Sequence, residues 1–289
     1  MIPLFLSLRP NQWTKNFFVF AGLIFSLEFF QITALFKAFD AFLIFCAISS
    51  AMYLINDLKD LAADQKHPIK KNRPIASGQV PILLAFYFAA LLLLVSIPLS
   101  FYFSTPFGWV VIAYVLLMLC YSFFLKNMVI LDVFSIAAGF VLRAIAGVVV
   151  INVVLSPWLV ICTILLALFI ALGKRRHELM TIDLATEHRK ILEEYSPRLL
   201  DQLISAVAGS TVIAYALYTL WPETIAKFGT TSLVYSVPFV LYGIFRYLYL
   251  IYKKEEGGQP EKTLLSDWPL LIDILLWIVA LMIIIYWRL

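Results

Sequence analysis

The stretch NDLKDLAADQKHPIKKNRPIASG, residues 56–78, decides the interpretation of this chain. It holds three aspartates, one histidine and five basic residues, although 63% of the 289 residues are hydrophobic and only 14% are charged. Such a concentration of charge is unusual in so apolar a chain. It marks the stretch as the first candidate for a functional site.

The low charge content indicates an integral membrane protein, because a soluble domain carries about one quarter charged residues. Apolar runs of about 17 to 25 residues can each cross a bilayer as a helix, since a helix satisfies its own backbone polar groups. We therefore predict an all-α polytopic bundle of nine transmembrane helices with a polar cavity facing the cytoplasm, folded as a single domain over residues 1–289. The predicted runs are 16–35, 39–58, 80–100, 107–125, 128–150, 156–173, 200–220, 232–252 and 268–287.

The basic residues predict the orientation of the bundle, because cytoplasmic loops hold the excess of Lys and Arg. With the N-terminus inside, the inner segments hold 17 of the 22 Lys and Arg residues. We expect a multi-pass protein of the cell membrane whose N-terminus and active site are cytoplasmic. The net charge of +4 follows this topology and gives no case for a nucleic-acid partner.

Four side chains of the opening stretch share one face of a helix. Each residue of an α-helix turns by about 100°, so with Asn56 as the origin, Asp60 lies at about 40°, Asp64 at about 80° and Asp57 at about 100°. Hard divalent cations prefer oxygen ligands of this kind, and Mg²⁺ usually shares its shell with substrate phosphates. The pattern predicts a magnesium-bound diphosphate.

The helix should end near His67, because Pro68 disfavours the helical conformation at the residue before it. The basic side chains that follow are suited to the outer phosphate oxygens. The alternative is a helix end at a membrane surface that carries mixed charge only for solvation and topology. The basic residues concerned are Lys66, Lys70, Lys71 and Arg73.

The same stretch resembles the first aspartate-rich motif, N-D-x-x-D-x-x-x-D, of the UbiA-type intramembrane prenyltransferase superfamily. The match is complete at Asn56, Asp57, Asp60 and Asp64. A nine-helix plan with a second polar segment after the sixth helix is also that superfamily's plan. The resemblance implies that the three aspartates are catalytic and hold Mg²⁺, with Asn56 beside them.

Four further stretches are similar to the decaprenyl-phosphate phosphoribosyltransferase branch of this superfamily: LRPNQWTKNFFVFAGL (8–23), YSFFLKN (121–127), LRAIAG (142–147) and GKRRHEL (173–179). Members of that branch join 5-phosphoribosyl diphosphate to a polyprenyl phosphate and release diphosphate, a step toward arabinan-type cell-envelope glycans. The resemblance therefore implies a magnesium-dependent glycosyltransferase with these two substrates.

The second polar segment, residues 173–198, departs from the aromatic-prenylating members, which carry another aspartate-rich motif there. A ribose with a second phosphate and an anionic acceptor require more fixed positive charge than a phenol and an allylic tail. The charged residues found in its first part are Lys174, Arg175, Arg176, Glu178 and Asp183.

Several candidate side chains also have plain structural explanations. Lys126 suits a phosphate at the membrane surface but is also a lysine that can extend to the interface. Arg143 lies inside an apolar run, where a charge is usually functional or paired. Arg9 and Lys15 either close over the substrate or anchor the first helix. The residues expected to bind substrate are Asn56, Lys15, His67, Lys70, Arg73, Lys126, Arg143, Lys174, Arg175, Glu178 and Asp183.

Two other functions remain as alternatives. An aromatic-acceptor polyprenyltransferase of the 4-hydroxybenzoate type would consume an allylic diphosphate. A transporter for a phosphorylated solute would need charged residues on both sides of the membrane, yet the predicted outer loops SFYFSTPF and VINVVLSPW carry none. A homo-oligomer is compatible with the sequence.

Overall fold

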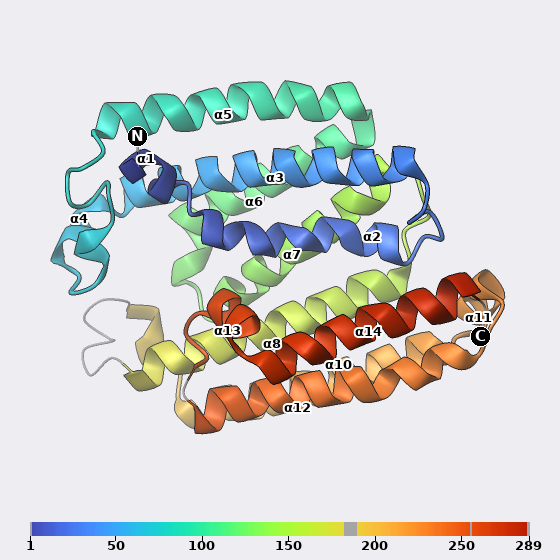
Figure 1. Cartoon of the computed structure of the whole chain (residues 1–289). Coiled ribbons are helices and arrows are strands. Elements are labelled where there is room, and N and C mark those ends of the chain that lie inside the picture. The colour runs from blue at the N-terminus through green and yellow to red at the C-terminus, as the bar shows by residue number, and fades with distance from the viewer. Residues whose placement is uncertain (1, 182–189, 255, 288–289) are drawn as a thin grey trace. The chain divides into compact units, whose positions relative to one another are not determined.

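The computed structural model describes residues 2–181, 190–254 and 256–287, and all regular structure in these ranges is helical (Figure 1). Eight helices in the described part of the chain are long and apolar enough to cross a membrane. The expected all-α membrane architecture is confirmed, and the predicted number of nine is approximate. The chain divides into two compact units, one formed by the residues up to Leu155 and the other chiefly by those from Ser156 onward.

The first unit is built around α3, which packs against α5, α6, α7 and the 3₁₀ helix η1. Figure 1 shows α3 and α5 side by side. The Phe45 ring of α3 lies at the centre of the unit, against the rings of Phe107 and Tyr114 from α6. The bounds are α1 Ile2–Ser7, η1 Pro10–Phe20, α2 Ala21–Ile24, α3 Ile32–Lys59, α4 Leu61–Lys66, η2 Lys70–Asn72, α5 Ile82–Phe103, α6 Thr105–Phe123, η3 Leu125–Asn127 and α7 Leu131–Val150.

The first predicted run, 16–35, is not one membrane-spanning helix. It is divided between η1, α2 and the start of α3, with a turn between the last two. Leu27 in this turn has a positive φ of 69°, and the Ser26 hydroxyl accepts a hydrogen bond from the backbone N–H of Glu28. Hydropathy alone could not locate the break, because the residues around the turn are mostly apolar.

Close backbone contact fixes η1 and α2 against α7. A Cβ atom on Gly147 would lie 1.7 Å from the carbonyl oxygen of Val19. A Cβ atom on Gly22 would lie 2.8 Å from a side-chain carbon of Val148. The two glycines therefore permit an approach that any other residue would obstruct. This contact positions the segment that carries Arg9 and Lys15.

The second unit pairs α8 with α10 and α12 with α14, and α10 also contacts α12. Residue chemistry explains where its helices begin. Ser196 caps α10 by accepting a hydrogen bond from the N–H of Leu199, and Pro197 occupies the first turn. The helices that follow Leu155 in the chain have the bounds α8 Pro157–Thr181, η4 Lys190–Glu194, α10 Pro197–Leu220, α11 Pro222–Phe228, η5 Ser232–Ser236, α12 Val237–Lys253, α13 Pro260–Ser266 and α14 Trp268–Trp287, and the first two residues of η4 belong to the first unit.

Candidate functional site

The aspartate-rich stretch lies at the end of α3 and continues into α4. Asp60 stands between the two helices, and helical hydrogen bonds run through it, from its own N–H to the carbonyl of Asn56 and from the Asp64 N–H to its carbonyl. The helical character predicted for this stretch is thus present. His67 has an extended conformation after α4, so the helix ends where Pro68 predicts.

Asp57 and Asp64 are buried, each with 4% of its surface exposed. Both carboxylates accept a hydrogen bond from the same nitrogen atom of Arg73. Nη1 of Arg73 lies 3.1 Å from Oδ1 of Asp57 and 2.6 Å from Oδ2 of Asp64. Asp57 also accepts from Arg9 at 2.5 Å. The two carboxylates therefore point toward the same position, which the guanidinium group of Arg73 occupies.

Arg9 reaches this point because of its backbone. It has a left-handed conformation, with φ 54° and ψ 61°, immediately before η1. Its guanidinium carbon also lies 4.9 Å from the centroid of the Tyr53 ring, a cation–π contact. The sequence placed Arg9 only in a polar segment before the first helix, since nothing in the local pattern links it to Asp57, 48 residues away.

Asp60 has a separate basic partner, Lys126 of η3. Its two carboxylate oxygens lie 2.5 Å and 2.8 Å from the Lys126 ammonium nitrogen. The neighbouring Lys59 has another role, because its ammonium group donates to the carbonyl of Ser122 and lies over the Phe123 ring. The site thus sets three carboxylates against three cationic side chains.

The donor set fits a magnesium ion that shares its shell with phosphate. No group of three His, Cys, Asp or Glu side chains in the described ranges is close enough to hold a metal alone. Mg²⁺ does not need one, since it is usually held by one or two carboxylates together with waters and substrate phosphates. The carboxylates of Asp57, Asp60 and Asp64 carry hard oxygen atoms of the kind that such an ion would bind.

The other candidates of the first unit differ in their surroundings. His67 is buried, and its Nδ1 accepts from the backbone N–H groups of Ile69 and Lys70, which favours a role in closing the turn. Asn56, Lys15 and Lys70 are half-buried. Their predicted contacts with substrate stay predictions.

Arg143 lies in a buried polar network within the first unit. Its three guanidinium nitrogens donate to the side chain of Asn16 at 2.7 Å, the carbonyl of Gly139 at 2.8 Å and the hydroxyl of Tyr114 at 2.7 Å. Asn16 in turn lies 3.3 Å from both Cys46 and Ser49. These contacts join η1 to α3, α6 and α7, and they favour packing over the substrate contact expected from the sequence.

The residues predicted in the second polar segment belong to the second unit. Arg175 is buried and pairs with Glu178 one turn later on α8, while Lys174 is half-buried. Arg176 contacts Asp201 of α10 at 2.6 Å and lies over the Tyr252 ring. Asp183 lies outside the described residues.

Known proteins resemble this chain in sequence and in fold. The profile of the UbiA prenyltransferase family matches residues 16–268. A decaprenyl-phosphate phosphoribosyltransferase of Corynebacterium glutamicum is 34% identical, over 97% of this chain and 86% of its own length. The protein of the same name from Mycolicibacterium smegmatis is also 34% identical, over 94% of this chain and 89% of its own. A solved UbiA homolog from Archaeoglobus fulgidus, bound to GPP and Mg²⁺, matches with a TM-score of 0.74 and 16% identity, covering 98% of this chain and 99% of its own.

Proposed function

Because this chain belongs to the UbiA prenyltransferase family, we propose that it transfers 5-phosphoribose from 5-phosphoribosyl diphosphate to a polyprenyl phosphate and releases diphosphate. Relatives that are 34% identical over nearly the whole chain and bear the name decaprenyl-phosphate phosphoribosyltransferase support this donor and this acceptor. The family match spans residues 16–268, which supports treating the whole chain as one transferase domain.

The observation that carries the proposal is that three carboxylates of the first unit form ion pairs with three basic side chains. Arg73 contacts both Asp57 and Asp64, and Lys126 contacts Asp60. A diphosphate with its metal presents the complementary charges, a cation toward the carboxylates and phosphate oxygens toward the guanidinium and ammonium groups. The ion pairs keep these groups in place and neutralised until the substrate enters.

The proposed reaction requires little acid–base chemistry. An oxygen atom of the lipid phosphate bonds to the anomeric carbon of the ribose, and the bond from that carbon to the diphosphate breaks, with the electron pair leaving on the diphosphate. The lipid phosphate is already anionic at neutral pH, so it needs no general base to attack.

The side chains of the site act on the leaving group. Arg9, Arg73 and Lys126 turn from the carboxylates to the phosphate oxygens and hold the diphosphate as it departs. Mg²⁺, when held by Asp57 and its two companions in the motif, supplies positive charge to the leaving diphosphate. Asn56, on the last turn of α3, positions the same group.

We also propose that the protein lies in the cell membrane with its N-terminus and this site at the cytoplasmic face. The Lys and Arg residues support this orientation, because the polar segments that carry them fall on one side of the predicted topology. The soluble donor 5-phosphoribosyl diphosphate would then reach the site from the cytoplasm.

The test is a transfer assay with the purified full chain. The protein is incubated with Mg²⁺, radiolabelled 5-phosphoribosyl diphosphate and a polyprenyl phosphate, and the lipid is then extracted into organic solvent. We expect label in the lipid phase that disappears with a chelator and in the Asp60→Asn variant. A parallel reaction supplies an allylic diphosphate and 4-hydroxybenzoate.

The two reactions separate the candidate functions. No label in the lipid, with prenylated 4-hydroxybenzoate in the parallel reaction, would replace the phosphoribosyltransferase by an aromatic prenyltransferase. Full label transfer by Asp60→Asn would remove the assignment of the aspartates to the diphosphate.

A further inference from the structure

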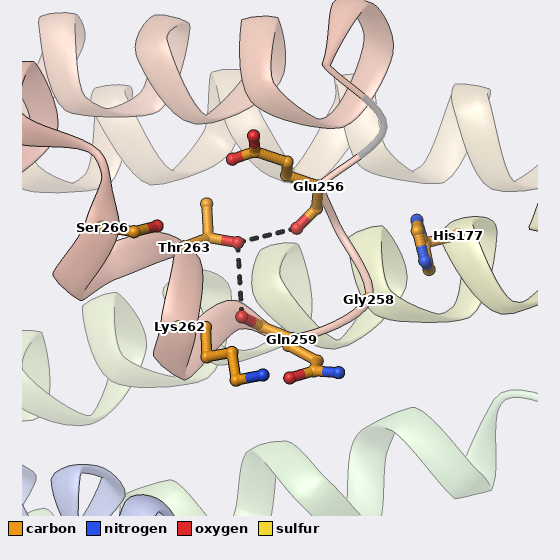
Figure 2. Close-up of a pocket in the computed structure, with 7 residues that line it drawn as sticks. All are labelled: His177, Glu256, Gly258, Gln259, Lys262, Thr263 and Ser266. Atoms are coloured by element: carbon orange, nitrogen blue, oxygen red, sulfur yellow. Dashed lines mark hydrogen bonds between the residues drawn. The ribbon is translucent and has the colours of Figure 1, made fainter. Parts of the chain in front are cut away.

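The second unit contains a pocket of about 280 Å³ that the aspartate motif does not form. Figure 2 shows His177 of α8 on one side and the segment Glu256–Ser266, which includes α13, on the other. The sequence assigned no role to His177 or to this segment. The pocket lies wholly within the second unit, so its walls can be considered by themselves.

Two adjacent glycines hold the segment directly on α8. A Cβ atom on Gly258 would lie 2.3 Å from a ring carbon of His177. A Cβ atom on Gly257 would lie 3.0 Å from the carbonyl oxygen of Gly173. Any side chain at these positions would displace the imidazole ring or lift the segment, so the glycines give the pocket its shape.

Hydrogen bonds fix the rest of the segment. The Thr263 hydroxyl donates to the carbonyl of Glu256 at 2.7 Å and lies 3.2 Å from that of Gln259 (Figure 2). Immediately after the segment, Asp267 accepts two hydrogen bonds from Arg246 of α12, at 2.7 Å and 3.0 Å. The pocket is therefore formed before any ligand binds, which lowers the entropic cost of binding.

Four polar side chains of the pocket can donate hydrogen bonds. Lys262 supplies an ammonium group, Gln259 an amide and Ser266 a hydroxyl, while His177 presents its imidazole ring from α8. These four side chains have no hydrogen bond or ion pair with the part of the chain that the structure describes. Figure 2 shows the Glu256 carboxylate directed away from Lys262 and Gln259. The lining suits an anion with several acceptor oxygens.

We propose that this pocket binds a phosphate monoester, an inference that rests on the proposed function for the identity of its ligand. A phosphate monoester carries nearly two negative charges at pH 7 and three acceptor oxygens. Two participants in the proposed reaction contain this group, the sugar donor at its 5-position and the polyprenyl phosphate at its head. The size of the pocket, at the lower end of the range for ligand sites, fits a head group or a sugar phosphate.

Equilibrium binding to the full chain in detergent, without Mg²⁺, tests the site directly. The probes are ribose 5-phosphate, farnesyl phosphate and unphosphorylated ribose, measured by titration calorimetry. We expect one of the two phosphates to bind and ribose not to bind. Binding of ribose 5-phosphate assigns the pocket to the donor, and binding of farnesyl phosphate assigns it to the lipid.

Variants locate the binding and separate the two proposals. Lys262→Gln should weaken it by about tenfold, the effect of losing one charge-assisted hydrogen bond. Gly258→Ala should weaken it by displacing His177. Lys253→Gln, an exposed lysine outside the pocket, and Asp60→Asn should leave it unchanged. Failure of both phosphates to bind, or equal affinity in Lys262→Gln and the unaltered protein, would overturn the inference even if the transfer assay succeeds.

Discussion

Lys126 holds both carboxylate oxygens of Asp60, at 2.5 Å and 2.8 Å, although 66 residues separate them in the chain. Asp60 is the most exposed of the three aspartates, with 28% of its side chain accessible against 4% and 5% for Asp57 and Asp64. It is thus the carboxylate that an entering ligand can reach with the least rearrangement, and Lys126 is its basic partner.

Lys126→Gln should therefore lower transfer by about tenfold or more, because one charge-assisted contact to the diphosphate is lost. The decrease should appear in kcat/KM for the diphosphate substrate. Lys37→Gln removes an exposed lysine to which no substrate contact is assigned and serves as the matched control. Equal losses in both variants would show that general positive charge, and not the position of Lys126, matters.

Arg73→Gln should make the protein less stable and its stability more dependent on magnesium. Removing Arg73 leaves the buried carboxylates of Asp57 and Asp64 close together with one cation fewer between them. A bound divalent cation would replace the missing charge. The melting temperature in detergent should fall, and added Mg²⁺ should raise it more in the variant than in the unaltered protein. Equal responses to Mg²⁺ would argue against a metal at these carboxylates.

Arg143→Gln distinguishes a structural role of Arg143 from a role in substrate binding. The substitution leaves the side-chain oxygens of Asn16 and Tyr114 without their donor in a buried environment, which costs about 1–3 kcal/mol for each group left unsatisfied. We expect a lower melting temperature with an unchanged KM for 5-phosphoribosyl diphosphate in the folded fraction. A raised KM at unchanged stability would instead support the substrate contact predicted from the sequence.

Asp267 should give the second unit a stability that depends on pH. Hydrogen bonds from Arg246 hold the pKa of Asp267 below its usual value. The ionised Asp267 carboxylate therefore stabilises the folded protein fully above the ordinary carboxyl pKa of about 4, and this stabilisation is lost as the pH falls through the lowered pKa of Asp267. The difference in melting temperature between the unaltered protein and Asp267→Asn should therefore shrink on acidification. Glu223→Gln, at an exposed carboxylate, should show no such trend.

Local chemistry in the sequence predicted the helical aspartate motif and its end. Asn56, Asp57, Asp60 and Asp64 follow a helical spacing, and Pro68 determines where α4 stops, because both effects act within a few residues. Hydropathy likewise located eight membrane-spanning helices to within a few residues, except that α3 begins well before its predicted start at residue 39 and α8 continues well beyond its predicted end at residue 173. The interior of a long helix is the easiest feature to predict from composition.

Contacts between distant segments could not be predicted in the same way. The pairs Arg9–Asp57 and Lys126–Asp60 depend on how η1 and η3 pack against the end of α3. The break in the first apolar run depends on a turn at Leu27 that hydropathy does not detect. The pocket beside His177 arises from the close contact of two glycines with α8. The sequence shows the two adjacent glycines but does not indicate which helix they contact.

The approach of Val19 to Gly147 has a consequence for how this gene tolerates variation. A library of all substitutions, selected for folded protein, should return glycine alone at position 147, since even alanine would bring its Cβ atom to 1.7 Å from a carbonyl oxygen. At Gly209, where nothing lies within 4 Å of the added atom, the same library should accept many residues. The contact between η1 and α7 therefore makes position 147 a point at which the protein can be inactivated without altering any group that touches substrate.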